Sequence, residues 1–320
     1  MEDVTNAARR VIPRNLAGTQ GYAAMRDSAA VIGRPLGILR LSGKDPTGML
    51  DAVLTNDVPK AQRAGVYALL LDPKGRIQTD LRVLKRNDSL LIVTEPEGLE
   101  AAETILGRYA PFSRVKVERL HGWSVLGLYG PEARRVLGVQ ELAEHETAEL
   151  SVGGVSLVAA GVEAPAKGYD LILPPDALDA VEDHLTREGA VPADPADYET
   201  LRVEAGVPRF GRDLTPENFP GESGVLHRAV NFRKGCYPGQ ETVARMHYRG
   251  SPNKTLRSFA VEGPPPEPGE DIFQGEKRVG KLTSVSPLRP NGETLALGYL
   301  ARSADAAGPL GAGEASLTPR

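Results

Sequence analysis

Cys236 stands out for its reactivity, because it is the single cysteine in a chain of 320 residues. A lone cysteine has no partner for an internal disulfide. Its thiol is therefore either a small apolar side chain packed in the core or a group that attacks electrophiles or ligates a metal. Lys234 lies two residues earlier, and a predicted helix begins a few residues later. Both features favour the thiolate, which is the reactive form.

The residues after the cysteine predict the elements that hold it. The sequence Tyr237-Pro238-Gly239-Gln240 fits a type II turn, with proline at its second position and glycine at its third, where φ is positive. Apolar residues at helical spacing predict a helix over residues 240–248. Glu241 falls in its first turn and Arg245 near its end, which suits the helix dipole.

Other chemistries find little support in the sequence. A cysteine hydrolase needs a histidine base, and His227 and His247 lie nine residues before and eleven residues after Cys236 without a local protease signature. The five histidines form no i, i+4 pair and there is no Cys-x-x-Cys, so no metal site is predicted within the chain. One thiolate can still be donated to a cluster shared with a partner.

The bulk composition limits the partners and the compartment. The formal net charge is −4, and no half of the chain is basic, so neither a nucleic acid nor an anionic membrane is an expected partner. The apolar runs are far shorter than a membrane span, and the N-terminus has no apolar secretory core. With one cysteine and no disulfide framework, we expect a cytoplasmic protein.

The elements that must position these residues follow a repeated pattern. Strands are predicted at 37–41, 66–71, 77–84 and 89–93, with a helix at 98–108, and then strands at 125–129, 155–159 and 169–173, with a helix near 175–187. The stretches ILRLSGKDPTGML and VLGLYGPEARRVL share the order strand, glycine, polar cap and amphipathic helix. We interpret this as an internal duplication of an α+β unit. A coincidence of two ordinary strand–helix junctions is the alternative.

The last part of the chain has a different pattern of predicted elements, with short strands and no helix. Short strands are predicted at 256–261, 271–273, 279–285, 294–300 and 315–317, spaced as in a small β-barrel. The proline cluster of residues 263–269 is interpreted as a loop of that barrel.

The cysteine stretch resembles the signature of YgfZ-type folate-binding proteins, which are relatives of the glycine-cleavage T-protein (aminomethyltransferase). The pattern Lys-Gly-Cys-Tyr-x-Gly-Gln-Glu, with an arginine four residues on, is present as Lys234, Gly235, Cys236, Tyr237, Gly239, Gln240, Glu241 and Arg245. The likeness continues at 216–220 and 248–250. Residues 202–206 and 210–213 also look like the superfamily's Arg-x-Glu-x-Gly…Tyr-Gly-x-Asp segment.

The resemblance implies an α+β fold of two ferredoxin-like lobes around a central cavity, plus a small C-terminal β-barrel. The cofactor implied is tetrahydrofolate, bound in the cavity. The expected division is a loose tail at 1–20, a two-lobed folate-binding region at 21–250 and the barrel at 251–320.

The resemblance also assigns roles to residues. Glu204 is implied to bind the pterin, since a carboxylate accepts two parallel N–H bonds from an aminopyrimidine edge. A plain helix carboxylate or an ion pair with Arg202 is the alternative. Tyr198 is expected near the folate, where it would stack on a ring, or is an ordinary half-buried tyrosine. The remaining residues implied to bind the cofactor are Arg202, Tyr237, Gln240, Glu241 and Arg245.

The departures from the T-protein pattern favour the YgfZ branch. The T-protein has an Asp-Asp pair, whereas the corresponding residues 77–81 of this chain contain one carboxylate, that of Asp80. The T-protein also lacks the cysteine signature. The YgfZ branch is associated with assembly or repair of iron–sulfur proteins, including radical-type tRNA-modifying enzymes. The resemblance therefore implies an accessory protein, rather than an enzyme, whose partners are iron–sulfur clients, with Cys236 and Lys234 as its reactive groups. The alternative is a folate-dependent aminomethyltransferase or demethylase that uses Asp80.

Overall fold

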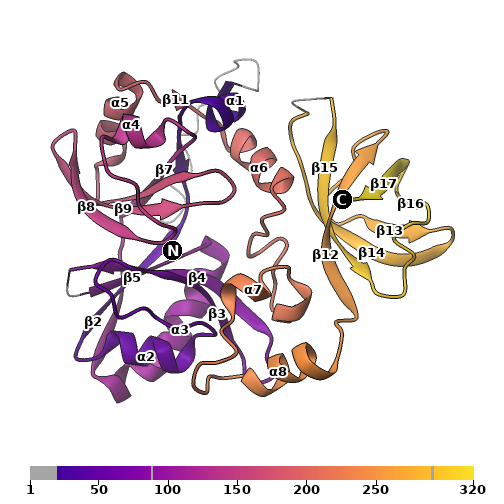
Figure 1. Cartoon of the computed structure of the whole chain (residues 1–320), viewed down its shortest axis with the longest axis horizontal. Coiled ribbons are helices and arrows are strands. Elements are labelled where there is room, and N and C mark those ends of the chain that lie inside the picture. The colour runs from indigo at the N-terminus through magenta and orange to yellow at the C-terminus, as the bar shows by residue number, and fades with distance from the viewer. Residues whose placement is uncertain (1–19, 88, 290–291) are drawn as a thin grey trace.

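The computed structural model describes residues 20–87, 89–289 and 292–320, so the loose tail predicted for residues 1–20 lies outside the described residues except for its last member. Figure 1 shows two β-sheets with their helices on one side of the molecule, a β-barrel on the other, and helix α6 (Pro195–Glu204) between them. The barrel is closed and antiparallel, with six strands. The predicted α+β class and the C-terminal barrel are confirmed.

The first lobe is a five-stranded sheet in the order β3-β4-β5-β2-β6. Its elements are β2 (Gly37–Gly43), α2 (Pro46–Val53), β3 (Val66–Leu71), β4 (Ile77–Arg86), β5 (Ser89–Thr94), α3 (Pro96–Ser113) and β6 (Val115–Arg119). Helix α2 begins after Asp45, whose carboxylate accepts the Gly48 N–H at 2.8 Å, and Pro46 suits the first turn. Because side chains alternate along a strand, Leu39 faces α2 and α3 while Ile38 faces the second lobe.

The second lobe is a six-stranded sheet in the order β11-β1-β7-β10-β9-β8. Its elements are α1 (Gln20–Asp27), β1 (Ala30–Arg34), β7 (Ser124–Tyr129), α4 (Ala133–Leu137), β8 (Thr147–Val152), β9 (Val155–Val162), β10 (Gly168–Leu173), α5 (Leu178–Arg187) and β11 (Val191–Pro192). From β7 onward it repeats the order β-α-β-β-β-α-β of the first lobe. Strand β1 interrupts the likeness, because it is inserted between β7 and β11.

The two sheets meet face to face through an apolar layer. This layer takes buried side chains from both lobes, which are Ile38, Leu84, Leu91, Val93, Val125, Val158, Ala160 and Ile172. Polar side chains of the same strands continue this inner face beyond the apolar layer, as described below. The lobes are thus held together by burial of apolar surface beside the polar groups of the candidate site.

The segment after α6 crosses from the lobes to the barrel. It contains the short helices η2 (Pro220–Glu222) and α7 (Leu226–Ala229) and the longer α8 (Gln240–Arg249). The barrel follows as β12 (Lys254–Glu262), β13 (Asp271–Gln274), β14 (Lys277–Val285), β15 (Thr294–Ala301), β16 (Leu310–Ala312) and β17 (Ala315–Pro319). The proline cluster lies in the loop between β12 and β13, as predicted. No helix among the described residues is long and apolar enough to cross a membrane.

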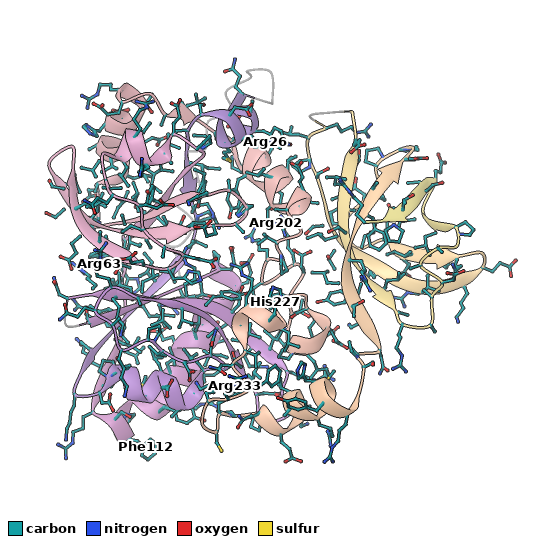
Figure 2. All side chains as sticks on the ribbon, viewed as in Figure 1. Arg26, Arg63, Phe112, Arg202, His227 and Arg233 are labelled. Carbon is teal, nitrogen blue, oxygen red and sulfur yellow. The ribbon has the colours of Figure 1, made fainter. Side chains whose placement is uncertain are left out.

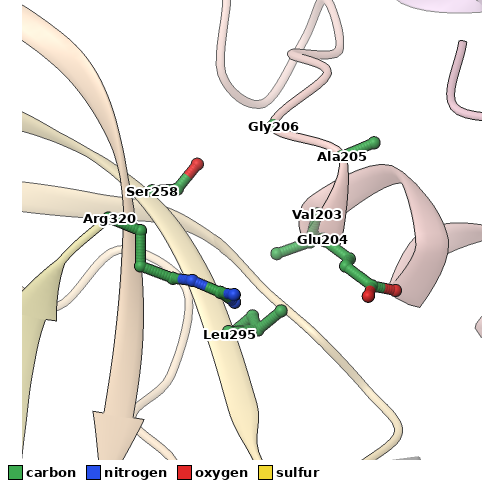
Figure 3. A pocket seen from close by; sticks show the side chains of 7 residues that line it. All are labelled: Val203, Glu204, Ala205, Gly206, Ser258, Leu295 and Arg320. Carbon is green, nitrogen blue, oxygen red and sulfur yellow. The ribbon is translucent and has the colours of Figure 1, made fainter.

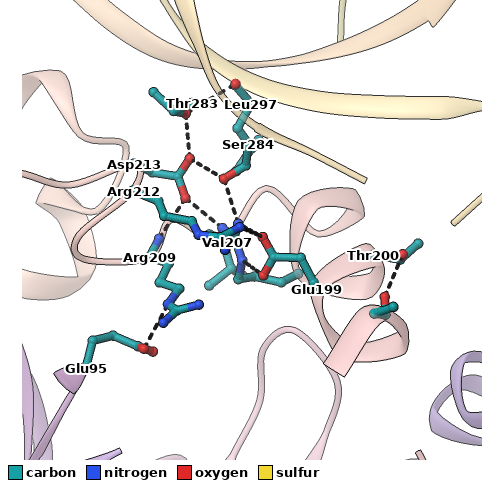
Figure 4. Close-up of polar contacts among 12 residues, drawn as sticks. Glu95, Glu199, Thr200, Val207, Arg209, Arg212, Asp213, Thr283, Ser284 and Leu297 are labelled. Atoms are coloured by element: carbon teal, nitrogen blue, oxygen red, sulfur yellow. Dashed lines mark hydrogen bonds and ion pairs between the residues drawn. The ribbon is translucent and has the colours of Figure 1, made fainter. Parts of the chain in front are cut away.

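A buried ionic network fixes α6 to the barrel (Figure 4). The Arg202 guanidinium donates to Asp213 at 2.7 Å and to the Ser284 hydroxyl of β14 at 2.7 Å, and it forms two bonds with Glu199. Only 3% of the Arg202 side chain is exposed, and none of the Asp213 side chain. Since buried charges need such partners, this network sets the position of α6 relative to the barrel.

Candidate functional site

The Cys236 thiol is free and exposed to solvent. The core-packing alternative predicted a buried side chain, so this observation favours a reactive group. The exposed thiol lies between two residues whose side chains turn inward. Lys234 precedes it and Tyr237 follows it, and each is anchored in the first lobe.

Lys234 is the first anchor. Its ammonium donates to the backbone carbonyls of Leu54 at 2.7 Å and Asn56 at 2.8 Å, and 1% of its side chain is exposed. Burial lowers the pKa of Lys234, against the opposite effect of the Asp51 and Asp57 carboxylates. The charge of this lysine is therefore directed at the 54–57 segment, and its predicted effect on the thiol stays a prediction.

Tyr237 and the turn after it form the second anchor. The Tyr237 ring packs in a buried cluster with Leu71 and Ile77, and burial raises the pKa of its hydroxyl to about 12. Gly239 has φ 79° and ψ 0°, and the Gln240 N–H donates to the Tyr237 carbonyl at 3.2 Å, so the predicted type II turn is confirmed. A Cβ on Gly239 would lie 2.6 Å from the carbonyl oxygen of Asp72. The turn thus rests directly on the β3–β4 hairpin.

Thr55 and Asn56 bind helix α7, which precedes the cysteine loop, to the first lobe. The buried Thr55 hydroxyl donates to the Ala229 carbonyl at 2.6 Å and accepts the Leu69 N–H at 2.9 Å. The Asn56 amide donates to the carbonyls of Tyr67 and Arg228 at 3.0 and 2.9 Å. These bonds explain why a Thr-Asn pair stands at this place in the sequence. The exposed thiol is carried by a rigidly supported loop.

Helix α8 follows the turn, as predicted, but its predicted cofactor residues face outward. Glu241 and Arg245 are exposed and Gln240 is half-buried. Within the described part of the chain, none of these three side chains has a hydrogen-bond partner. Their assignment to the cofactor stays a prediction.

Asp80 lies on the inner face of the first lobe, between the two sheets. Its carboxylate accepts the Tyr67 hydroxyl at 2.8 Å. Burial raises the pKa of Asp80 to about 7, opposed by the Tyr67 hydrogen bond and reinforced by the Glu95 carboxylate. Arg82, two residues on, points to the same side of β4. Asp80 therefore belongs to a group of polar residues that lines the junction of the lobes.

This inter-lobe cluster is continuous from one sheet to the other. Arg82 of β4 and the Tyr129 hydroxyl of β7 both donate to the buried Asp170 of β10. Arg34 of β1 donates to the Tyr129 hydroxyl at 2.9 Å and lies 3.6 Å from Glu95. The Arg34 guanidinium also lies 3.9 Å from the centroid of the Tyr198 ring. Tyr198 is therefore the predicted folate residue that the structure brings into the same region as Asp80.

His145 closes one side of the inter-lobe cluster. Its ring stacks on Tyr67 with centroids 6.5 Å apart. Burial, with the nearby Arg82 and Arg228 guanidinium groups, lowers its pKa to about 2, so the imidazole stays neutral. The Nδ1 atom of His145 and the Nε and Nη2 atoms of Arg82 are buried and unpartnered in the described residues. Unmet hydrogen-bonding groups of this kind are expected where a polar ligand or ordered water binds.

Glu204 lies at the end of α6, apart from this cluster. Its carboxylate accepts the Tyr22 hydroxyl at 2.6 Å and an Arg26 N–H at 3.1 Å. It borders a hollow of about 210 Å³ between α6 and the barrel, whose other side chains include Ser258 and Arg320 (Figure 3). The carboxylate is paired with Arg26 and not, as the alternative interpretation had it, with Arg202.

The predicted residues thus occupy separate regions. Among the described residues, no hydrogen bond, ion pair or ring contact joins Cys236 to Asp80, Tyr198 or Glu204. No group of three or more His, Cys, Asp or Glu side chains in the described ranges is arranged to hold a metal ion. Figure 2 shows Arg202 near the middle of the molecule, between the lobes and the barrel, and Arg233, three positions before Cys236, well below it in the view.

Sequence reasoning missed most of the inter-lobe cluster. The residues it did not single out are Arg34, Tyr67, Arg82, Glu95, Tyr129, His145 and Asp170. The sequence QTDLRV carried a signal, because Asp80 and Arg82 stand on one face of the strand and alternate with the apolar Leu81 and Val83 on the other. Tyr129 and Asp170 gave no such signal, since the pairing of two distant strands brings them together.

Two family descriptions match the chain. The GCVT N-terminal domain matches residues 16–234, and the CAF17 C-terminal beta-barrel domain matches residues 253–320. The chain is 27% identical over 276 residues to an aminomethyltransferase of Rubrobacter xylanophilus, covering 83% of this chain and 74% of that protein. It is 29% identical over 237 residues to the tRNA-modifying protein YgfZ of Klebsiella pneumoniae, covering 72% of each.

A solved structure has the same fold. The glycine cleavage system aminomethyltransferase T from Bartonella henselae superposes with a TM-score of 0.82 at 19% identity, covering 93% of this chain and 86% of that one. At this identity the likeness shows the fold alone. The resemblance inferred from the cysteine signature is nevertheless confirmed by the family matches. The chain belongs to the family defined by the GCVT N-terminal domain, and it carries a CAF17-type C-terminal β-barrel.

Proposed function

We propose that this protein is a tetrahydrofolate-binding accessory factor for the assembly or repair of iron–sulfur enzymes. On this proposal the two lobes are ferredoxin-like products of a duplication within residues 21–250, and the folate binds between them. Cys236 is the reactive group. The observation that carries the proposal is the exposed Cys236 thiol on a loop anchored on both sides by residues of its signature.

The inter-lobe cluster suits a folate chemically. The pteridine ring of a folate presents N–H groups that carboxylates accept and a flat surface that an aromatic side chain can stack on, and the glutamate tail of the folate carries carboxylates that guanidinium groups bind. Asp80 and Glu95 supply the carboxylates and Arg82 the guanidinium, and Tyr198 supplies the aromatic ring once the Arg34 guanidinium that covers it at 3.9 Å moves aside. Glu204 already accepts one hydrogen bond at each oxygen, from Tyr22 and Arg26, so a pterin there would share the carboxylate with these two donors.

Folate titrations with two carboxylate variants decide between these positions. If the pterin binds in the inter-lobe cluster, Asp80→Asn weakens tetrahydrofolate binding and Glu204→Gln leaves it unchanged. The reverse result assigns the pterin to Glu204. No binding by the unaltered protein would refute the folate part of the proposal.

Replacing the thiol tests the accessory role. In cells that lack the protein, Cys236→Ala is expected to leave the fold and the tetrahydrofolate affinity unchanged but to lower the activity of a radical-type tRNA-modifying enzyme, read as the fraction of modified tRNA. Ser151→Ala is the matched control, since Ser151 is also exposed but lies on β8 of the second lobe, away from the cysteine loop. Full activity with Cys236→Ala would contradict the proposed role of the thiol.

A folate-dependent one-carbon transferase is the second candidate, favoured by the state of Asp80. A carboxylate with a pKa of about 7 beside a tyrosine hydroxyl is suited to accept a proton near neutral pH. This candidate predicts turnover of aminomethyl or N-methyl substrates with tetrahydrofolate, and loss of that turnover in Asp80→Asn. Absence of turnover, or turnover that ignores the substitution, eliminates it.

A further inference from the structure

Helix α8 borders a small apolar hollow at the surface, a few residues after the thiol. The hollow has a volume of about 140 Å³, and its lining includes Gly221, Leu226, Val243, Met246 and His247. A cavity of roughly 150 Å³ lined by apolar side chains accepts a group the size of benzene. The hollow can therefore take one apolar side chain.

Both rims of the hollow carry exposed arginines. At 100° per residue, Arg249 and Arg245 lie about 60° and 100° around the α8 axis from Met246, so they flank the hollow on that side. On the other side, the Phe232 ring stacks on His247, which lines the hollow, with centroids 4.1 Å apart, and Arg233 is the next residue along the chain. All three arginines are exposed, and their side chains have no partner within the described residues.

The charge and the lining together indicate what binds there. Exposed guanidinium groups that form no ion pair with a carboxylate attract an acidic partner. A nucleic acid is also acidic, and the exposed Tyr248 could stack on a base. However, the walls of the hollow are made by Leu226, Val243 and Met246, which suit an apolar amino-acid side chain. The combination fits a protein segment with one apolar residue between acidic residues.

The hollow is close enough to the thiol for one partner to reach both. Val243 is seven positions after Cys236, so their Cα atoms lie no more than about 25 Å apart. Part of that stretch is the tight turn before α8, which shortens the distance further.

We propose that the hollow beside α8, with Arg233, Arg245 and Arg249, is the docking site for an acidic segment of an iron–sulfur client protein, whose apolar side chain enters the hollow. The identity of the partner as a client rests on the proposed function. The chemistry of the bound segment rests on this surface alone.

Three probes test the docking site on the full chain. The first is a fluorescent acidic peptide with one central leucine, the second is the same peptide with glycine instead, and the third is a single-stranded oligouridylate of equal charge. Fluorescence anisotropy measures each dissociation constant. We expect the leucine peptide to bind at least about tenfold more tightly than the glycine peptide, because burying a leucine side chain contributes that much.

Two substitutions test the two parts of the surface. A Cβ on Gly221 would lie 3.9 Å from Cε of Met246, and Gly221 has no positive φ, so Gly221→Leu fills the hollow without backbone strain. It is expected to abolish the preference for leucine. The double substitution Arg245→Glu and Arg249→Glu is expected to weaken both peptides about tenfold or more. Gly107→Leu and Arg108→Glu are the controls, since both residues are exposed on α3.

The outcomes separate this inference from the proposed function. Equal binding of the two peptides, or no binding up to about 1 mM, overturns the docking site. Tighter binding of the oligouridylate, lost in the double arginine variant, overturns it in favour of a nucleic-acid surface. Tetrahydrofolate titration of Gly221→Leu, which alters no residue assigned to the cofactor, is expected to match the unaltered protein. If peptide binding occurs without folate binding, the docking site stands and the folate proposal fails.

Discussion

Gly239→Ala is expected to destabilise the loop that carries the thiol. Gly239 has φ 79°, a conformation that costs an L-residue about 1–2 kcal/mol. The added Cβ would also lie 2.6 Å from the Asp72 carbonyl oxygen and 2.7 Å from the Gly75 Cα, which are backbone atoms that cannot turn away. We expect a loss in the free energy of unfolding of about 2 kcal/mol or more, because the turn must also lift off the hairpin.

Gly235→Ala is the matched control on the other side of the cysteine. A Cβ there meets nothing within 4 Å, and φ is not positive. This substitution is expected to leave stability unchanged or to raise it by up to about 1 kcal/mol through the unfolded state. The pair thus compares the same chemical change at two glycines that flank one thiol.

Two assays read the result. Urea unfolding followed by circular dichroism gives the free energy of unfolding, and an aromatic disulfide reagent gives the labelling rate of Cys236, the single cysteine of the chain. Gly239→Ala is expected to lower stability and to change the labelling rate, whereas Gly235→Ala keeps the stability. Equal stability of the two variants would refute the idea that the turn on the hairpin supports the thiol.

Three further predictions concern the buried charges. Since the pKa of Asp80 is raised from an ordinary value near 4 to about 7, its contribution to stability is present at acidic pH and is lost as the pH rises to about 7. The unaltered protein should therefore lose stability relative to Asp80→Asn across that interval in urea unfolding, and a pH-independent difference would contradict this. Arg202→Met leaves the carboxylate of Asp213 buried without its guanidinium, and a loss of about 3–5 kcal/mol is expected by the same measurement, while a loss below 1 kcal/mol would argue against the network. Lys234→Met leaves two carbonyls without their donor, so we expect a loss of about 1–3 kcal/mol and faster labelling of the thiol, and an unchanged labelling rate would contradict the anchor.

The sequence predicted the elements well where local patterns decide them. Strands β3 and β4, the type II turn and α8 lie where alternation, Pro-Gly and helical spacing put them. Strand β1 was missed although its residues are apolar, because its place between β7 and β11 depends on a pairing that no local pattern encodes.

Only the part of the candidate site that is formed by neighbouring residues, the loop around Cys236, could be predicted from the sequence. The signature around Cys236 identified the loop, but the direction of Lys234 depends on carbonyls 180 and 178 residues away along the chain. The inter-lobe cluster is likewise a product of tertiary pairing, since Arg82 and Asp170 are 88 residues apart. Residues that come into contact only when two sheets pack together have no regular spacing in the sequence by which they could be recognised.

The network around Arg202 has a consequence for the two modules of the chain. The Ser284 hydroxyl, on β14 of the barrel, accepts a hydrogen bond from Arg202 of α6 and donates one to Asp213. Helix α6 belongs to the other matched domain. Truncation before the barrel would open this ionic contact to water and free the helix that bears Tyr198. The small barrel thus stabilises the position of the helix that carries Tyr198, so the lobes depend on the barrel for part of their structure.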